Sequence, residues 1–398
     1  MHPNVPHLRF PEFHGEWEKH GLSEYLDFKN GLNPDSKRFG KGIKFISVMD
    51  ILNNPVITYD CIRASVQATD AEISSFSVEN GDILFQRSSE TLEDVGRANV
   101  YIDDRVAVFG GFVIRGKKKA NYNPLFFRYL LSSPYARKRI IPMGAGAQHF
   151  NIGQEGLSKV SLNFPSIEEQ TKIASLLHLL DERIATQSKL IEDLKKLKSA
   201  IVDYAIDSLD ADFVKFGSLY ETAGEGGTPT TSNAQFYEDG KIPFIKIDDL
   251  KKKYLTENKD FITELGLQKS SAWLVPSRSI LFSNGATIGE ITITTYPVCT
   301  KQGILGIVPK PNIDVEFLYY FMSSSYFKKA VSRIVTEGTM KTAYLKDINN
   351  IRCPIPIKEK QQDIAKMPSA LNSKIDFEQS ILKLFGSQKQ YLLRQMFM

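Results

Sequence analysis

Two stretches of the chain carry apolar residues at alternating steps of three and four, the spacing of one face of a long helix. The first stretch is residues 166–209 and the second is residues 358–398. The apolar positions of the first are Ile173, Leu177, Leu180, Ile184, Ile191, Leu194, Ile201 and Ala205. Those of the second are Ile364, Leu371, Ile375, Leu382, Phe385, Leu392 and Met396. The pattern predicts two long helices that pack on each other, with packing of each helix on its own domain as the alternative.

Polar residues fill two positions of each apolar face: Gln187 and Lys198 in the first helix, Glu378 and Lys389 in the second. Pro368 should break or kink the start of the second helix, because proline lacks the N–H group and its ring clashes with the preceding turn.

The remaining sequence is also arranged as two copies. Residues 165–174 match residues 356–365 at an offset of 191 residues, which leads from Gln170 to Gln361. The same offset pairs residues 129–133 with residues 320–324. Repeats at such a fixed offset indicate that one structural unit occurs twice.

Short runs of β-branched and aromatic residues predict strands in both copies. The predicted strands are residues 43–48, 82–85 and 106–109 in the first copy, and residues 242–247 and 279–282 in the second. A shorter helix is predicted over residues 124–139 and at its counterpart, residues 315–334.

These patterns predict an α+β fold with four segments. Two pseudo-repeated mixed α/β domains, residues 1–165 and 210–357, are joined by two long antiparallel helices, residues 166–209 and 358–398. The helices form a coiled-coil-like spacer between the domains.

Composition narrows the class of protein. The chain has 398 residues, 42% of them hydrophobic and 24% charged, as in soluble globular proteins with several domains. Its net charge of +4 permits nucleic-acid binding without demonstrating it. Three widely spaced cysteines favour a reducing environment. No apolar run approaches the roughly 20 residues of a membrane span, and no signal peptide is recognisable, so we expect a cytoplasmic protein without membrane contact.

Motifs for catalysis are not apparent. An adenine methyltransferase needs an Asn/Asp-Pro-Pro-aromatic loop, and the nearest match, residues 33–36, lacks the aromatic residue. The glycine-rich residues 224–228 lack the Gly-Lys-Ser/Thr of a phosphate loop. We therefore expect no active site, no metal site and no cofactor on this chain.

Polar loops, most of which contain glycine, follow strands at three equivalent places in the two copies. They are residues 86–91 and 283–289, residues 144–151 and 337–342, and residues 30–41 and 226–235. Arg, Lys, Asn and Gln can read base edges, whereas Ser and Thr suit phosphate oxygens. A solvated turn is the alternative for any single loop. The candidate DNA-contacting residues are Lys37, Arg38, Arg87, Ser88, Ser89, Arg97, Gln148, His149, Asn151, Thr228, Thr230, Lys246, Ser283, Asn284, Thr287, Lys301, Lys341 and Thr342.

Taken together, the repeats resemble the specificity subunit of type I restriction–modification systems, and the resemblance covers essentially the whole chain. It is carried by the two-copy layout and by residues 81–85, 164–170, 284–289, 354–361 and 389–397. The first copy departs from the pattern, because residues 90–96 replace the short Gly-Ala-Thr-Ile-Gly turn of the second.

The resemblance implies that each mixed domain is a target recognition domain, which reads one half of a bipartite site in double-stranded DNA. It also implies that two methyltransferase subunits dock on the helices and bring S-adenosylmethionine. Two restriction/translocase subunits, which use ATP and Mg, can join them. The chain itself would be non-catalytic. Candidates for the methyltransferase contact are Leu176, Leu190, Leu197 and Tyr204, although self-packing would explain them equally well.

Two alternatives remain open from the sequence. One is a coiled-coil scaffold without DNA readout, which would lack salt-dependent affinity for DNA. The other is the specificity subunit of another type of restriction system.

Overall fold

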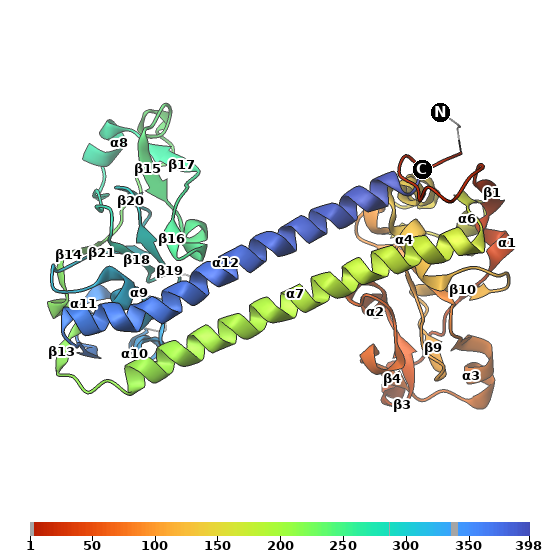
Figure 1. Cartoon of the computed structure of the whole chain (residues 1–398), viewed down its shortest axis with the longest axis horizontal. Helices are drawn as coiled ribbons and strands as arrows, with labels where there is room; N and C mark the ends of the chain where they lie inside the picture. Colours follow the sequence, from red (N-terminus) through yellow and green to blue (C-terminus); the bar gives the residue numbers. More distant parts are fainter. Residues whose placement is uncertain (1–3, 286, 336–340) are drawn as a thin grey trace. The chain divides into compact units, whose positions relative to one another are not determined.

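The computed structural model describes residues 4–285, 287–335 and 341–398. The chain forms two compact units (Figure 1). Unit 1 contains Met1–Ser188 and Ile381–Met398, and unit 2 contains Lys189–Ser380. Both long helices are divided between the units. The limits of the four segments expected from the sequence stay a prediction.

Unit 1 is built around two four-stranded sheets. The first has the strand order β2-β10-β6-β8 and is antiparallel throughout. The second has the order β4-β3-β9-β5, in which only β3 and β9 run parallel. Two pairs, β1-β12 and β7-β11, complete the unit. The strands are β1 Glu18–Gly21, β2 Leu26–Asn30, β3 Phe39–Ile46, β4 Ser65–Val66, β5 Ser77–Val78, β6 Ile83–Gln86, β7 Ser88–Ser89, β8 Ala98–Val100, β9 Ala107–Phe109, β10 Val113–Lys118, β11 Phe150–Asn151 and β12 Ser161–Phe164.

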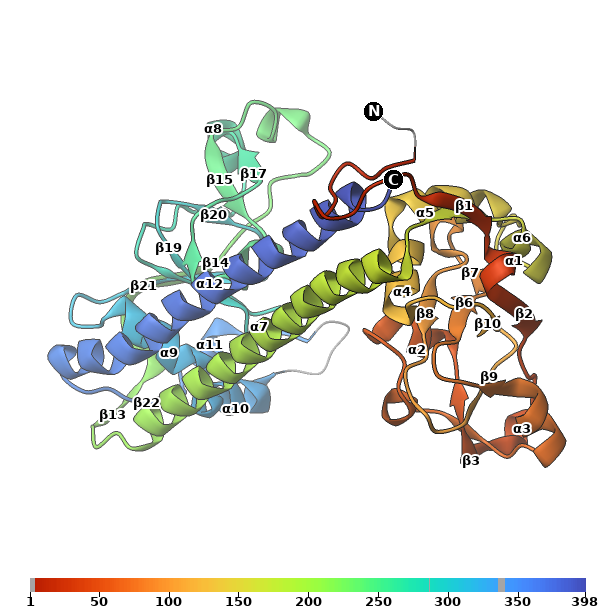
Figure 2. The ribbon, with the colours of Figure 1, turned by 45° about the vertical axis from the view of Figure 1, so that its right-hand side comes forward.

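Helices cover these sheets and close the core of unit 1. They are α1 Leu22–Tyr25, α2 Val48–Asn53, α3 Asp70–Phe76, α4 Pro124–Ser132, α5 Pro134–Ile140 and α6 Gln154–Ser158. Helix α4 packs on β6 and β8 (Figure 1 and Figure 2). The largest core cluster contains Trp17, Phe126 and Phe127 together with Leu392 and Phe397 near the end of the chain. The last turns of the C-terminal helix are therefore part of this core.

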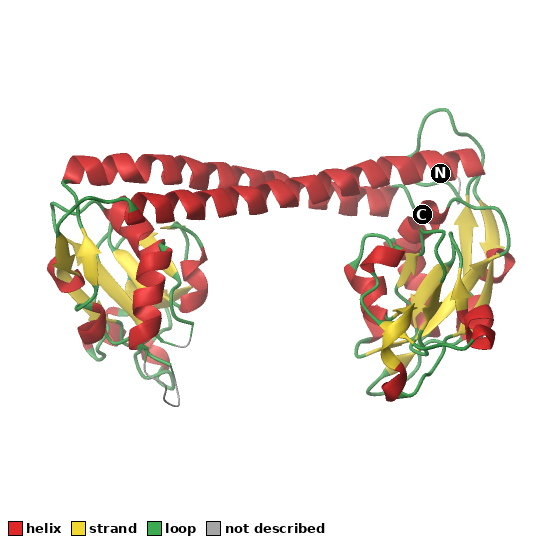
Figure 3. Cartoon of the chain, turned by 90° about the horizontal axis from the view of Figure 1, so that it is seen from below, coloured by secondary structure: helices red, strands yellow, loops and turns green. Residues whose placement is uncertain are grey.

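Unit 2 repeats the arrangement with different loops. Its main sheet has the order β14-β21-β18-β19-β16, and a smaller one has the order β17-β15-β20. Helix α9 packs on β18 and β19, as α4 packs on β6 and β8, and Figure 3 shows helices (red) beside the strands (yellow) of each unit. The strands are β13 Phe213–Lys215, β14 Tyr220–Glu225, β15 Ile242–Ile245, β16 Tyr254–Leu255, β17 Asp260–Ile262, β18 Ile280–Ser283, β19 Ile291–Thr294, β20 Cys299–Thr300, β21 Ile304–Pro309 and β22 Arg352–Pro354; the helices are α8 Glu264–Gln268, α9 Val315–Ser323, α10 Ser325–Ile334 and α11 Leu345–Ile348.

The strands predicted from the sequence are confirmed, and the shorter predicted helices are each divided by a serine. Ser133 separates α4 from α5, and Ser324 separates α9 from α10. In both units the serine Oγ accepts the amide N–H of the third residue beyond it at 3.3 Å, which caps the second helix. The repeated Ser-Ser of the sequence is therefore the signal for a helix start.

The repeated proline–glutamine motif anchors each long helix to its unit. The side-chain amide of Gln170 donates to the carbonyl of Pro165 at 3.0 Å, and its oxygen accepts the N–H of Asn123 at 3.1 Å. Gln361 makes the same two bonds at the equivalent positions, both at 2.8 Å. Both glutamines are buried. The motif that reveals the repeat in the sequence is thus a structural joint.

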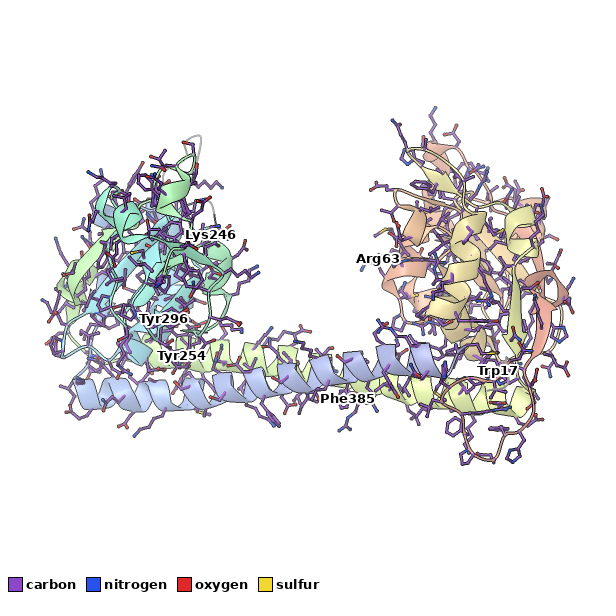
Figure 4. The ribbon with its side chains drawn as sticks, turned by 90° about the horizontal axis from the view of Figure 1, so that it is seen from above. Trp17, Arg63, Lys246, Tyr254, Tyr296 and Phe385 are labelled. Atoms are coloured by element: carbon purple, nitrogen blue, oxygen red, sulfur yellow. The ribbon has the colours of Figure 1, made fainter. Side chains whose placement is uncertain are left out.

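The two long helices, α7 Ile167–Asp207 and α12 Lys358–Gln395, are confirmed (Figure 1). Buried and half-buried residues follow the predicted apolar face along each of them. In unit 1, Asp181 pairs with Lys389, and the guanidinium of Arg183 lies 5.8 Å from the ring of Phe385, labelled in Figure 4. Because the numbers rise along one helix as they fall along the other, the helices are antiparallel there.

The same direction holds in unit 2. Lys198 Nζ donates to Asn372 Oδ1 at 2.9 Å, and Val202 shares a core cluster with Ala365. Helix α12 continues through Pro368, so of the predicted break or kink the break does not occur. Proline removes only one backbone hydrogen bond, and the ring of Pro368 is buried on the apolar face. We infer that this packing offsets the lost bond.

Candidate nucleic-acid interface

Predicted contact residues from two separate loops of unit 1 meet at the β7–β11 pair. The hydroxyl of Ser88 donates to the side-chain oxygen of Asn151, 63 residues further along the chain. Gln148 and His149 lie exposed in the turn before β11, and the His149 carbonyl accepts the side-chain N–H of Asn151 at 3.3 Å. A polar surface is thereby assembled from residues that are distant in sequence.

Arg87 lies between β6 and β7 and is half-buried. Its backbone N–H donates to the carbonyl of Phe112 at 2.9 Å, and its Nη1 donates to the carbonyl of Gly111 at 3.2 Å. A guanidinium carries five N–H donors. No other side-chain bond from Arg87 reaches a described residue, so donors remain for a ligand.

At the equivalent place in unit 2 two of the predicted residues, Ser283 and Asn284, are buried. Asn284 donates to the carbonyl of Ala343 at 3.3 Å, and Ser283 accepts the N–H of Glu290 at 2.8 Å. Ser89 in unit 1 is buried as well, and its hydroxyl donates to the carbonyl of Thr91. These three side chains shape their loops and could meet a base only after the loops had moved.

Three of the predicted cations are engaged in ion pairs. Arg38 binds both carboxylate oxygens of Glu72, one of them at 3.0 Å. This hydrogen bonding lowers the pKa of Glu72 from its usual 4.5 to about 2. Arg97 pairs with Asp94 at 2.6 Å, and Lys246 (Figure 4) pairs with Asp260 at 2.7 Å. A phosphate would have to compete with a carboxylate at each of these sites.

Other predicted cations are exposed and available. Lys37, Lys301 and Lys341 make no ion pair with any described residue. Thr230 and Thr287 are exposed, whereas Thr228 and Thr342 are half-buried. Residues 337–340 of the predicted loops, and position 286, lie outside the described residues. All 18 assignments stay predictions.

Two exposed side chains of unit 1 were not predicted as contact residues from the sequence. Arg63, labelled in Figure 4, is exposed and makes no hydrogen bond or ion pair with the described part of the chain. Phe112 is an exposed aromatic residue at the turn between β9 and β10. A signal for Phe112 was present, because it follows Gly110-Gly111 directly after a predicted strand.

In the described ranges, no cluster of three or more His, Cys, Asp or Glu side chains is placed to hold a metal ion. None of the helices in these ranges combines the length and the apolar content of a bilayer span. The features that the two units offer are therefore polar loops, cations and exposed apolar side chains.

The family described as "Type I restriction modification DNA specificity domain" matches the chain twice, at residues 14–196 and 209–384. The two matches cover most of both units. The chain therefore belongs to this family, and it contains two copies of the family's domain.

Curated relatives carry related names. The chain is 24% identical over 399 residues to the "Putative type I restriction enzyme MjaX specificity subunit" of Methanocaldococcus jannaschii, covering 94% of this chain and 91% of that protein. It is 23% identical over 410 residues to the "Type I restriction enzyme HindI specificity subunit" of Haemophilus influenzae, with 81% and 86% covered.

Solved structures share the fold. The crystal structure of a type I restriction–modification S subunit from M. genitalium matches with a TM-score of 0.58 at 17% identity, covering 99% of both chains. A chain from a study of assembly and conformational transition of the type I system matches with a TM-score of 0.59 at 14% identity, covering 96% of this chain and 98% of that one. The predicted fold class is thereby confirmed.

Proposed function

We propose that this chain is the DNA sequence-specificity subunit of a type I restriction–modification complex. Each unit's domain reads one half of a bipartite duplex target, and the chain itself performs no chemistry. The observation that carries the proposal is the family's DNA specificity domain, matched twice along the chain. A DNA target also agrees with the cytoplasmic location expected from the sequence.

The contrast between scaffold and loops supports two different half-sites. The backbone bond from Gly110 to Ile46, 3.0 Å, has its counterpart from Lys301 to Ile245, 2.9 Å. The side chains at these equivalent turns nevertheless differ, and so do the neighbouring loops. Because base edges are read by side chains, one scaffold with two sets of loops suits an asymmetric target.

Exposed apolar residues on the long helices support docking of partner subunits. In unit 2, helix α7 presents Leu190, Leu197 and Tyr204 at seven-residue steps, and all three are exposed. In unit 1, helix α12 presents Leu384 and Tyr391 at the same step, also exposed. Seven-residue steps keep side chains on one face of a helix, and exposed apolar groups of this size mark interaction sites.

The proposed occupants of these helix faces are two methyltransferase subunits. Leu176, the fourth candidate from the sequence, is half-buried and so contributes less surface than the other three. S-adenosylmethionine would be bound by the methyltransferase subunits, and ATP and Mg by restriction/translocase subunits when these join.

The test is sequencing of genomic adenine methylation in cells with and without the gene. We expect a bipartite methylated motif that disappears when the gene is deleted. Unchanged methylation, with the methyltransferase partners present and expressed, would contradict the proposal.

A binding assay separates the proposal from a scaffold without DNA readout. The assembled complex should bind the target duplex with an affinity that falls steeply as salt rises, because phosphate contacts release counterions. A complex that assembles but shows no salt-dependent affinity for any duplex would favour the scaffold.

A further inference from the structure

An apolar hollow of about 450 Å³ opens beside Ser88 in unit 1. Its walls include Phe39, Phe45, Val48, Met49 and Phe112. We propose that this hollow takes the C5-methyl group of a thymine exposed in the major groove of the target DNA. The inference rests on the proposed function and names the kind of base that one part of unit 1 would read.

Several large apolar side chains of the hollow face solvent. Phe112 is 68% exposed, Met49 61% and Phe39 42%. Single exposed apolar residues are common on proteins, but a cluster around one opening marks an interaction site. The ring of Phe39 meets that of Phe45 edge-on at 5.1 Å, so the exposed ring is supported from the buried side.

The turn that carries Phe112 is held rigidly. The carbonyl of Phe112 accepts the N–H of Arg87 at 2.9 Å, and the N–H of Val113 donates to the carbonyl of Gly110 at 2.8 Å. A Cβ atom at Gly111 would lie 1.7 Å from the side-chain oxygen of Asn33, so Asn33 would have to move to admit a larger residue there. The backbone that carries the aromatic ring is therefore held in place, which reduces the ordering cost of binding.

The surroundings favour DNA over a protein as the occupant. The segment at residues 31–48 contributes most of the hollow and carries four cations, Lys37, Arg38, Lys41 and Lys44, against one acid, Asp35. Lys37 and Lys41 are exposed and unpaired among the described residues, so they are free to contact phosphates. Ser88, which also lines the hollow, joins it to the polar surface at Asn151.

The chemistry of base edges points to thymine. In the major groove every base edge presents hydrogen-bonding groups, and thymine alone adds a methyl group. Burying a polar edge against apolar walls without a partner is unfavourable, whereas contact between a phenylalanine ring and a thymine methyl is a known form of readout. The volume of about 450 Å³ is ample for the methyl group and the adjoining ring edge.

Unit 2 presents different chemistry at the equivalent turn. Asn284 N–H donates to Gly303 at 3.0 Å, as Arg87 N–H donates to Phe112. Phe112 is therefore replaced by a glycine, and the turn offers the exposed side chains of Lys301 and Gln302. Thymine contact through an aromatic ring is accordingly expected in one half-site only.

The test uses the full chain assembled with its methyltransferase subunits and the duplex that it methylates. Each thymine of the target is replaced in turn by uracil, which lacks only the methyl group. At one or more thymines of a single half-site, affinity should fall about fourfold, the factor that corresponds to loss of one buried methyl-sized group.

Variants of the chain connect that loss to Phe112. Phe112→Ser should bind the thymine and uracil duplexes equally, while Phe112→Leu should keep part of the difference. Val106→Ser, which changes another exposed apolar residue of unit 1, should leave the difference intact.

The outcomes are separable. If DNA binding is intact but no thymine-to-uracil exchange matters, or if Phe112→Ser keeps the difference, the inference is wrong and the proposed function stands. Another outcome is that Phe112→Ser prevents assembly with the methyltransferase subunits, while the parent complex binds thymine and uracil duplexes equally. In that case the hollow receives a protein partner and not DNA. If no duplex binds in a salt-dependent way, the proposed function itself fails.

Discussion

The two units connect their long helices at equivalent positions but with different charges. In unit 1, Asp181 of α7 pairs with Lys389 of α12 and, at 3.3 Å, with Arg128 of the domain. The residue equivalent to Asp181 is Asn372 of α12, which accepts a hydrogen bond from Lys198 at 2.9 Å. The repeat thus keeps a polar contact between the helices, with a carboxylate at this position in unit 1 and an amide in unit 2.

In unit 2 the charges lie at a neighbouring place. Lys253 is buried, pairs with Glu316 of α9 and donates to Ser369 of α12 at 2.9 Å. Its ammonium also lies 4.7 Å from the ring centre of Tyr320. Burial alone would raise the pKa of Glu316, but hydrogen bonds from Lys253 and Tyr254 outweigh it and hold that pKa below its usual range.

This difference teaches what a duplicated scaffold must preserve. The joints made by backbone groups and glutamine are the same in both units, since their geometry is fixed by helix ends. The charged contacts have changed, because any arrangement is tolerated in which each buried charge keeps a partner. Substitutions at the glutamine joints and at the charged contacts separate the two kinds of contact.

The largest effect is expected for Lys253→Met. It leaves the carboxylate of Glu316 half-buried without its cation, and breaking a buried pair costs about 3–5 kcal/mol. Native-state hydrogen exchange of α9 should report the loss of local stability. The double variant Lys253→Met/Glu316→Leu should recover most of it, and exposed Lys252→Met should change little. Equal losses from the single and double variants would contradict the pairing argument.

Asp181→Asn should convert the contact of unit 1 into the type found in unit 2. Arg128 and Lys389 lose their carboxylate partner, and charge-assisted hydrogen bonds contribute about 1.5–3 kcal/mol. Hydrogen exchange of the amides of α4 should therefore become faster. The neighbouring Glu182→Gln, which alters an exposed carboxylate of the same helix, is the matched control. An effect no larger than that of the control would mean that Asp181 is dispensable.

The glutamine joints should behave alike in the two units. Gln170→Ala and Gln361→Ala each leave buried backbone groups without partners, which costs about 1–3 kcal/mol. Exchange measured at α4 and α9 should give two values within this range, with the loss for Gln361→Ala the larger because Gln361 Nε2 also donates to the carbonyl of Asn312 at 3.2 Å. Gln362→Ala, at an exposed neighbour, should have little effect. A large difference between the two joints would break the proposed equivalence.

The smallest effect is a dependence on pH in unit 1. Because the pKa of Glu72 is lowered from 4.5 to about 2, its pairing with Arg38 stabilises the folded state above pH 4.5. That contribution is lost as the pH falls through about 2. Protection of α3 from hydrogen exchange, corrected for the intrinsic rate, should decline with acid in the parent chain. The Glu72→Gln variant should lack this part of the decline. If protection fell with acid in the same way in the variant and in the parent chain, the decline could not be assigned to Glu72.

Much of this architecture could be predicted from the sequence because it repeats simple periodicities. The long helices follow from apolar residues at steps of three and four, and the offset between Gln170 and Gln361 reveals the duplication. Of the break or kink expected at Pro368, a break does not occur, because α12 continues through this residue. A local rule about proline could not include the burial of its ring.

The nucleic-acid interface was less predictable, because the exposure of each candidate side chain depends on how its loop packs in the folded unit. Ser88 and Asn151 meet only through the pairing of β7 with β11. Asn284 looks like a reader of bases in the sequence, yet its backbone and side chain bind Ala343 and bury it. The two glycines before Phe112 signal a turn in the sequence, but the 68% exposure of this residue is seen only in the fold.

The central claim is that one scaffold carries two independent reading surfaces. Its most direct test is to replace residues 210–357 with the matching segment of a relative and to sequence adenine methylation in cells that express the hybrid with its partners. We expect one half of the methylated motif to change while the other half stays as in the parent. A change in both halves would contradict independent reading by the two units.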